Sequence, residues 1–297
     1  MTEQVVYAYA VARDSTELAE ALSGLEGVAR SPVHLVRGGQ GGELVAAVSP
    51  VDAADFGEVP LRRHLEDLTW LEAVARAHHG VIEALTERIT VLPLRLATVY
   101  LDDDRVRGML DRRGDVFADR LARLTAHVEW GVKLYVEPSA EEPPPAVPAS
   151  DDAGPGRSYL RRRRAERHAR DDVYRTARSA AESVAEAARR YAVEHARHRV
   201  QQGELARGPG ENVTNDAYLV PLERGEEFRS EVRRAVEGLS GIRVEVTGPW
   251  APYSFAAPVE THDEGHEGAP AAGEPPDAPG GVPGERPAHR GTQRAAP

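Results

Sequence analysis

The chain has 297 residues, of which 41% are hydrophobic and 29% are charged, and its formal net charge is −11. Once two long Pro-rich stretches are set aside, this length favours two modest globular domains, and no apolar run approaches the roughly 20 residues of a membrane-spanning helix. The absence of cysteine excludes disulfides, thiol nucleophiles and thiolate metal sites, and the negative charge argues against nucleic acid as a partner.

The first 51 residues predict a strand, a short helix and a β-hairpin. VVYAYAVA (5–12) alternates and is rich in β-branched and aromatic residues, as strands are. Asp14 or Ser15 is placed to cap the helix that follows. Two apolar stretches then flank GGQGGE, whose glycines allow the positive φ of a hairpin turn. This N-terminus has no secretory signal, so we expect a cytoplasmic protein with no membrane partner.

A long amphipathic helix is predicted from Leu61 to Ile89, because apolar residues recur at every third or fourth position. His78 interrupts this apolar stripe. We interpret it as a buried histidine satisfied by one hydrogen bond. The alternative is a small-molecule-binding or enzymatic α+β protein with a cleft near His78 and Arg95. The members of the stripe are Leu65, Leu68, Leu71, Val74, Val81 and Leu85.

Two short extended segments, a helix and a strand follow. Pro93 interrupts the apolar run ITVLPLRLATVYL, which favours a strand start, a bulge or an edge strand. The helix DDDRVRGMLDRRGDVFADRLARL begins with Asp102, Asp103 and Asp104, which we interpret as a cap and dipole partners rather than a cation site. HVEWGVKLYVEP is expected to be the strand.

The second half predicts alternating helices and strands. A helix from Ser158 to Ala196 is followed by the strand NDAYLVPL, the helix GEEFRSEVRRAVEGLS and the strand IRVEVTGPW. Together with the preceding strand, this order favours a ferredoxin-like layer with helices on one face of the sheet. The predicted fold class is therefore α+β, with two domains that each pack a small mixed or antiparallel sheet against helices.

Composition sets the expected domain boundaries. A Pro- and acid-rich linker and a Pro/Gly-rich tail lack the apolar pattern needed to form a core. The expected parts are an N-terminal α+β domain (1–136), the linker or loop (137–157), a C-terminal α+β domain with a long Arg-rich helix (158–257) and a disordered tail (258–297).

No residue set in the sequence predicts catalysis, cofactor binding or metal binding, so the protein is not expected to be an enzyme. His262 and His266 have the types of metal ligands, but they lie in the tail, where no helix holds their geometry. GGQGGE lacks the lysine of a phosphate-binding loop.

A run of arginines is the first candidate interaction site. Four consecutive arginines on a helix point in different directions, so some of them must be exposed. One interpretation is a solvated face with local ion pairs, and the other is a patch that binds an acidic partner. The residues are Arg161, Arg162, Arg163 and Arg164.

The second candidate is VTGPWAPYSF (246–255), which precedes the tail. Its two prolines exclude an ordinary helix and hold Trp250, Tyr253 and Phe255 at fixed places. These aromatics either clamp the sheet edge or domain junction, or form a docking surface for an apolar partner. We favour the clamp, with Trp250 largely buried and Tyr253 facing outward.

This closing segment resembles the signature of the gas vesicle GvpL/GvpF family. Further similar segments occur in family order: VVYAYAV, HHGVIEAL, VLPLRLATVY, EWGVKLYV, SYLRRRR and NDAYLVP. The resemblance spans roughly residues 5–256. The chain departs from the family pattern at Leu96 and Ala97, where Phe and Gly are usual, and at Ala251, where Pro is common.

The resemblance implies a non-catalytic accessory or minor structural protein of gas vesicles. It also implies a two-domain α+β fold, binding to the apolar shell protein GvpA and to other accessory proteins during vesicle formation, and a cytoplasmic, vesicle-associated location. It leaves open the oligomeric state and the choice between GvpL and GvpF.

Overall fold

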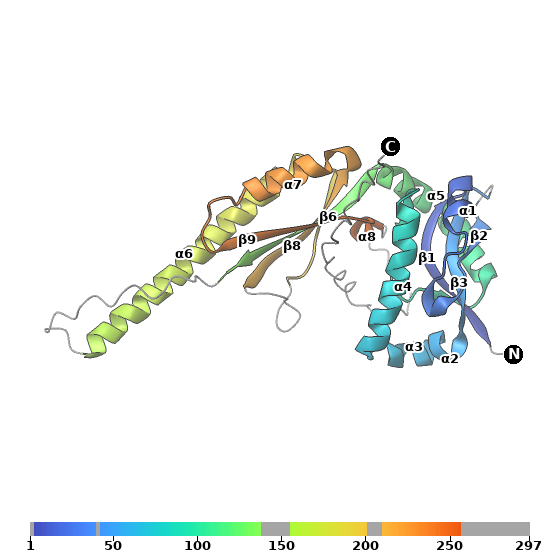
Figure 1. Ribbon diagram of the computed structural model, residues 1–297, viewed down its shortest axis with the longest axis horizontal. Coiled ribbons are helices and arrows are strands. Elements are labelled where there is room, and N and C mark those ends of the chain that lie inside the picture. Colours follow the sequence, from blue (N-terminus) through green and yellow to red (C-terminus); the bar gives the residue numbers. More distant parts are fainter. Residues whose placement is uncertain (1–2, 40–41, 138–154, 201–209, 257–297) are drawn as a thin grey trace, which may run out of the picture. The chain divides into compact units, whose positions relative to one another are not determined.

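The computed structural model describes residues 3–39, 42–137, 155–200 and 210–256. Within these ranges the protein is mixed α+β, with two antiparallel sheets that each pack against helices (Figure 1). The predicted fold class is thus confirmed. None of the helices in these ranges combines the length and the apolar character that a bilayer span requires.

The N-terminal sheet is built around β1 (Gln4–Arg13). This strand pairs antiparallel with β3 (Leu44–Asp52), and its other edge pairs with β4 (Val91–Pro93) and β5 (Val99–Tyr100). The hairpin partner β2 (His34–Gly38) lies beyond β3, so the strand order is β2-β3-β1-β4. β4 is short and at the edge, where a proline is tolerated.

Helices cover both faces of this sheet because β1 is apolar on both sides. Tyr7 belongs to one core with α1 (Thr16–Ala21) and α4 (Leu68–Thr86). The next residue, Ala8, faces the opposite core, which is formed with α5 (Asp103–Leu124). Two short helical segments lie beside the first core, namely the 3-10 turn Val28–Arg30 and α2 (Ala53–Phe56).

Side-chain caps begin two of these helices where the sequence indicated. The Ser15 hydroxyl accepts a hydrogen bond of 3.2 Å from the backbone N–H of Leu18 at the start of α1. The Asp102 carboxylate accepts one of 2.8 Å from the backbone N–H of Arg105 at the start of α5. Each cap satisfies a backbone donor that the first turn of a helix leaves unpaired.

The prediction of one continuous helix from Leu61 was wrong. α3 (Glu58–His64) ends before α4 begins, and the Asp67 side chain caps α4 by accepting hydrogen bonds of 2.9 and 3.2 Å from its first turn. The break separates two leucines from the apolar stripe. Leu65 is 39% exposed and Leu68 is 78% exposed, whereas the stripe from Val74 onward is buried.

The second sheet has the ferredoxin-like topology. β6 (His127–Val136) lies between β8 (Glu211–Pro221) and β9 (Ile242–Trp250), and β7 (Glu194–Arg197) forms the other edge. All pairs are antiparallel, in the order β7-β8-β6-β9. The core on one face comes from α6 and α7, whose bounds are Pro155–Arg189 and Gly225–Arg234.

Both sheets share the same strand order. In chain order the second sheet reads β6-α6-β7-β8-α7-β9, which is the split βαβ arrangement. The N-terminal sheet has the equivalent series β1-α1-β2-β3-α4-β4, and α5 is an added helix on its second face. The sequence patterns predicted this topology for the C-terminal half alone.

One strand was missed. The helix expected to reach Ala196 ends at Arg189, and Glu194–Arg197 is β7. The backbone N–H of Val193 donates to the carbonyl of Leu219 (2.8 Å), which starts the pairing of β7 with β8. A four-residue edge strand with charged side chains carries no alternation that would separate it from the end of a helix.

Of the expected domain boundaries, the described residues concern mainly the one that ends the N-terminal domain at residue 136. β6 lies within the expected N-terminal span (1–136) but pairs with β8 and β9. If each sheet defines a domain, we propose that the boundary falls near Ala126. Most of the expected linker (138–154) and all of the tail (258–297), with His262 and His266, lie outside the described residues.

Candidate interaction site

The closing segment leaves β9 through a close backbone contact. Gly248 has φ of +127°, and a Cβ atom at this position would lie 2.8 Å from the backbone oxygen of Glu129 and 3.2 Å from the ring of Trp130. Only glycine fits both the conformation and the space. The Gly248–Pro249 peptide bond is cis, and the short helix α8 (Tyr253–Ala256) follows.

The three aromatics of this segment differ in burial. Phe255 is 2% exposed and lies in the core that α5 shares with β8. Trp250 and Tyr253 are half-buried and both face His79, with ring centroids 6.1 and 6.2 Å from its imidazole. The Tyr253 hydroxyl lies 3.4 Å from Nδ1 of His79. The expectation that Trp250 is largely buried and Tyr253 faces outward is therefore not met, because both are partly covered.

A polar chain ties the same segment to the second sheet. The Ser254 hydroxyl donates to Oε1 of Glu129 (2.6 Å), and its backbone N–H donates to Oε2 (2.8 Å). Nε2 of His198 lies 2.9 Å from the same hydroxyl. Burial raises the pKa of Glu129 to about 7, although both hydrogen bonds from Ser254 oppose the shift. A serine between a histidine and a carboxylate differs from a nucleophile site, in which the acid orients the histidine.

Arg120 of α5 adds a second connection. Its guanidinium donates to the carbonyl oxygen of Phe255 and makes two hydrogen bonds of 3.1 Å with the carboxylate of Glu194 on β7. The Arg120 side chain is only 11% exposed. The sequence did not identify four of these polar residues, since they lie far from the closing segment along the chain and form no motif. They are Arg120, Glu129, Glu194 and His198.

His78 is part of a buried polar cluster in the N-terminal core. It is 3% exposed, and its Nδ1 lies 3.0 Å from the Tyr7 hydroxyl. That hydroxyl also accepts a hydrogen bond of 3.0 Å from the backbone N–H of Ala97, which leaves its own hydrogen for Nδ1. Burial lowers the pKa of His78 to about 4, although the backbone of Leu94, by hydrogen bonding, acts to raise it. His78 is therefore a neutral core residue at pH 7.

This geometry does not support the cleft that the alternative function requires. Arg95 is exposed, and the hydrogen bonds of the described residues do not join it or a carboxylate to His78. Ala97 has φ of +61°, in the left-handed region that favours glycine. Ala97 thus adopts a left-handed conformation although it has a Cβ atom, and its N–H donates to the Tyr7 hydroxyl.

The arginine run lies in the first half of α6. Arg163 and Arg164 are exposed. Arg161 and Arg162 belong to the same helix, but the side chains of these two are not among those that the structure describes. The buried residues of α6 begin at Ala177 within the part of the chain that the structure describes. The described side chains in the basic half of the helix therefore contribute little to the core of the second sheet.

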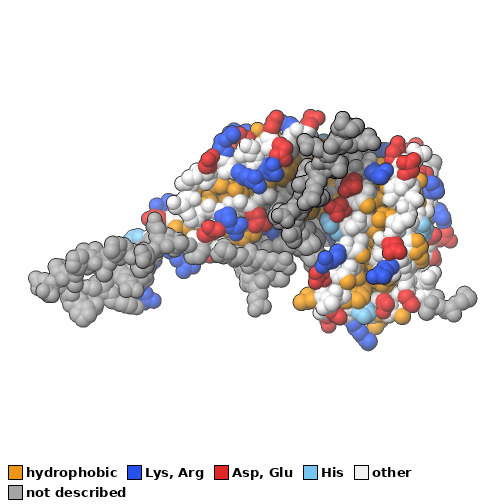
Figure 2. Space-filling model, in the orientation of Figure 1, with side chains coloured by type: hydrophobic (Ala, Val, Ile, Leu, Met, Phe, Trp, Pro, Cys, Tyr) orange, Lys and Arg blue, Asp and Glu red, His pale blue; other side chains and the backbone are white. Residues whose placement is uncertain are grey.

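Exposed apolar side chains gather where α3 and α4 meet. We call Val59, Leu65 and Leu68 the α3–α4 corner; they are 62%, 39% and 78% exposed. In Figure 2 hydrophobic side chains reach the surface at the end of the N-terminal part where these helices begin. An isolated exposed leucine is common on protein surfaces, whereas a large contiguous apolar patch marks an interaction site.

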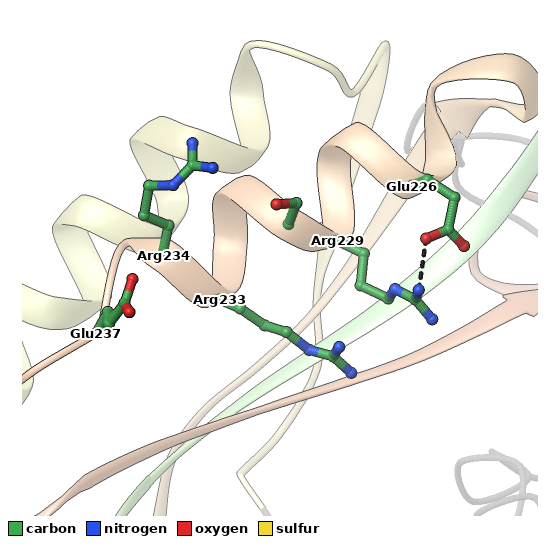
Figure 3. A pocket seen from close by; sticks show the side chains of 6 residues that line it. Glu226, Arg229, Arg233, Arg234 and Glu237 are labelled. Atoms are coloured by element: carbon green, nitrogen blue, oxygen red, sulfur yellow. Dashed lines mark hydrogen bonds and ion pairs between the residues drawn. The ribbon is translucent and has the colours of Figure 1, made fainter.

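A hollow of about 570 Å³ runs along α7. Figure 3 shows that charged side chains line it and that Glu226 pairs with Arg229. It contains no histidine and no buried acid, so it offers no catalytic set. Across the described ranges, no group of three or more His, Asp or Glu side chains is arranged to hold a metal ion. The lining residues are Glu226, Arg229, Ser230, Arg233, Arg234 and Glu237.

Comparison with known proteins gives consistent matches. The family model described as "Gas vesicle synthesis protein GvpL/GvpF" matches residues 5–257. Gas vesicle protein L of Streptomyces sp. (strain CB03234) is 44% identical over 262 residues, which is 87% of this chain and 95% of that protein. Gas vesicle protein F of the same strain is 28% identical over 257 residues, covering 84% and 98%.

Solved structures show the same fold. The crystal structure of the gas vesicle protein GvpF from Anabaena sp. PCC7120 superposes with a TM-score of 0.60 at 18% identity, covering 89% of this chain and 100% of that one. GvpF from Microcystis aeruginosa gives a TM-score of 0.56 at 19% identity, with coverages of 85% and 99%.

Proposed function

Because the chain belongs to the GvpL/GvpF family of gas vesicle synthesis proteins, we propose that it is an accessory or minor structural protein that binds the apolar shell protein GvpA and other accessory proteins while gas vesicles form. The observation that carries this proposal is the family match across residues 5–257, together with 44% identity to a gas vesicle protein L. Its place of action is the cytoplasm, in association with gas vesicles. Its role is binding, with no cofactor.

The α3–α4 corner is the surface that we assign to GvpA. A chain that must capture an apolar subunit needs exposed apolar side chains that its own core does not require. Val59, Leu65 and Leu68 meet this description, since they are exposed and lie around the break between two helices: Val59 in α3, Leu65 at its C-terminal end and Leu68 at the start of α4. Capture at this corner would cover apolar surface on both partners and keep the subunit from aggregating before it enters the shell.

The two sites identified from the sequence receive different roles. Arg163 and Arg164 are exposed charges suited to acidic surfaces of other accessory proteins. Trp250, Tyr253 and Phe255 act as a clamp, because Phe255 is buried and the other two pack beside His79.

Co-purification tests the GvpA contact. The tagged chain is co-expressed with GvpA, and the captured GvpA is quantified for the wild type and for the double variant Leu65→Ser/Leu68→Ser. We expect the double variant to lose most of the captured GvpA while its circular dichroism and thermal unfolding stay close to those of the wild type.

The matched control is Leu222→Ser. Leu222 is 61% exposed but lies beside the second sheet, so its replacement removes similar apolar surface elsewhere. Equal capture by the wild type and the double variant would remove the corner from the interface. Absence of GvpA from the wild-type eluate would reject the binding proposal.

A further inference from the structure

The outer edge of β9 is a long strand edge that the described elements leave unpaired. β9 is the terminal strand of the order β7-β8-β6-β9 and pairs with β6 alone (Figure 1). Among the described residues, backbone hydrogen bonds outside the β6–β9 ladder involve none of the residues from Ile242 to Trp250. A strand edge of nine residues exposes backbone donors and acceptors that another strand can use.

The side chains of β9 divide cleanly between its two faces. Ile242, Val244 and Val246 pack partly buried against the core formed by α6 and α7. Arg243 and Glu245 alternate with them and face the opposite side, where their side chains are 33% and 41% exposed. An incoming strand therefore meets an apolar row on one face and a charged pair on the other.

The order of these residues makes β9 complementary to itself. In a two-fold antiparallel pair centred on Val244, Val244 lies opposite its own copy, and Ile242 lies opposite Val246. Arg243 then lies opposite Glu245 in both halves of the pair. Moving the centre by one residue in either direction would place Arg243 against Arg243 or Glu245 against Glu245. Opposite charges stabilise a cross-strand pair and like charges destabilise it, so one register is selected.

Within one copy Arg243 already has three partners, and one of them, Tyr135, lies opposite it on β6. Its guanidinium lies 4.1 Å from the centre of the Tyr135 ring, and its nitrogens lie 2.7 Å from Glu137 and 3.2 Å from Glu245. A second copy would complete a closed set of two arginines and two glutamates with alternating charge. Gly248 and Pro249 end the usable ladder, because a proline has no N–H to donate.

From this edge we propose that the protein forms a two-fold dimer in which β9 pairs antiparallel with β9 of a second copy, centred on Val244. The two four-stranded sheets then become one continuous sheet. This inference is independent of the proposed binding of GvpA.

A single cysteine tests the register, since the chain has no native cysteine. In Val244→Cys the two introduced side chains face each other across the dimer axis, within the Cα separation that a disulfide accepts. We expect mild oxidation to convert most of this variant to a reducible dimer on a denaturing gel. The control Val193→Cys is more exposed, since Val193 is 57% exposed, but it lies beside the opposite edge of the sheet and should stay monomeric on the gel.

Charge reversal tests the pairing without a covalent bond. Sedimentation equilibrium of the full chain should give a dimer, and Arg243→Glu alone or Glu245→Arg alone should weaken the dimer by roughly tenfold or more, because two cross-strand pairs become repulsive. The double variant Arg243→Glu/Glu245→Arg restores opposite charges and should regain most of the affinity. Arg76→Glu, in an exposed ion pair of α4, is the control that should leave dimerisation unchanged.

The possible outcomes separate the proposal from its rivals. A wild type that stays monomeric at all concentrations overturns the proposal, and so does a dimer that Arg243→Glu does not weaken. Equal cross-linking of Val244→Cys and Val193→Cys also overturns it. If the wild type is monomeric and Arg243→Glu instead lowers the capture of GvpA, the edge takes the shell protein rather than a second copy. GvpA capture with an intact β9 dimer leaves both proposals standing.

Discussion

Replacing His78 with Gln should change how the stability of the protein depends on pH. In the folded protein His78 is 3% exposed and has a pKa of about 4, compared with 6.5 in the unfolded chain. Between these two values the unfolded chain binds a proton that the folded protein does not bind. The free energy of unfolding therefore falls as the pH falls through this window, and the contribution is fully present above pH 6.5.

The size of the effect follows from the two pKa values. Since one pKa unit corresponds to about 1.4 kcal/mol, His78 should account for a loss of about 2.5 kcal/mol between pH 7 and pH 4.5. Gln is neutral at both pH values, and its side-chain oxygen can still accept from the Tyr7 hydroxyl. His78→Gln should therefore abolish this part of the pH dependence, whatever its effect on stability at pH 7.

The assay is urea unfolding of wild type and His78→Gln at pH 7 and at pH 4.5, followed by circular dichroism. The quantity compared is the change in unfolding free energy between the two pH values, because all other titrating groups are common to both proteins. A loss on acidification that is about 2.5 kcal/mol smaller in the variant is the expected result. The same pH dependence in both proteins would show that His78 is not kept neutral by burial.

Three further predictions concern the turns and the closing segment. Ala97→Gly should raise the unfolding free energy by about 1 kcal/mol because φ is +61° there. Ala73→Gly on the exposed face of α4 should lower it by a similar amount. Melting temperatures of the two variants that shift in the same direction would contradict this prediction. Glu129 has a folded pKa of about 7 against 4.5 unfolded, so its contribution is present below pH 4.5 and is lost as the pH rises through 7. In the wild type the free energy of unfolding should therefore fall by about 1–2 kcal/mol over this pH range, a value reduced for the partial exposure of Glu129, and Glu129→Gln should remove this fall. An unfolding free energy, measured with urea, that depends on pH equally in both proteins would refute the prediction. Gly248→Ala should lower the unfolding free energy by about 2 kcal/mol or more, since a Cβ would lie 2.8 Å from a backbone oxygen. Gly80→Ala, with open space around it in α4, should raise it by about 1 kcal/mol in the same thermal denaturation experiments. A Gly248→Ala variant as stable as the wild type would show that the backbone does not need glycine there.

His78 and Glu129 change the free energy of unfolding in opposite directions as the pH rises, over nearly the same pH range. Their effects partly cancel in the wild type, which is why the single variants are more informative than the wild-type profile. A wild-type stability that changes little between pH 4.5 and pH 7 is consistent with both predictions.

Local patterns in the sequence predicted most of the elements. The alternation of VVYAYAVA predicted β1. Asp14 or Ser15 marked the start of α1, and the acids from Asp102 to Asp104 marked that of α5, because a strand period or a cap depends on a few neighbouring residues. The break between α3 and α4 escaped this reasoning, since Leu65 and Leu68 continue the helical spacing although Asp67 starts a new helix between them.

The connections of the closing segment had no local signal. Ser254 and Glu129 are 125 positions apart, and Arg120 and Phe255 are 135 apart. The contact of Ser254 with Glu129 needs β6 to lie next to β9, and that strand order follows from tertiary pairing rather than from any stretch of sequence. The sequence predicted that the aromatics of the segment matter, whereas the polar groups that hold the segment in place are seen only in the structure.

The role in gas vesicle formation is tested most directly by deleting the gene in a host that forms visible vesicles and by counting vesicles with electron microscopy. We predict that deletion abolishes vesicles, that the wild-type gene and Leu222→Ser restore them, and that Leu65→Ser/Leu68→Ser does not. Normal numbers of vesicles in the deletion strain would contradict the account.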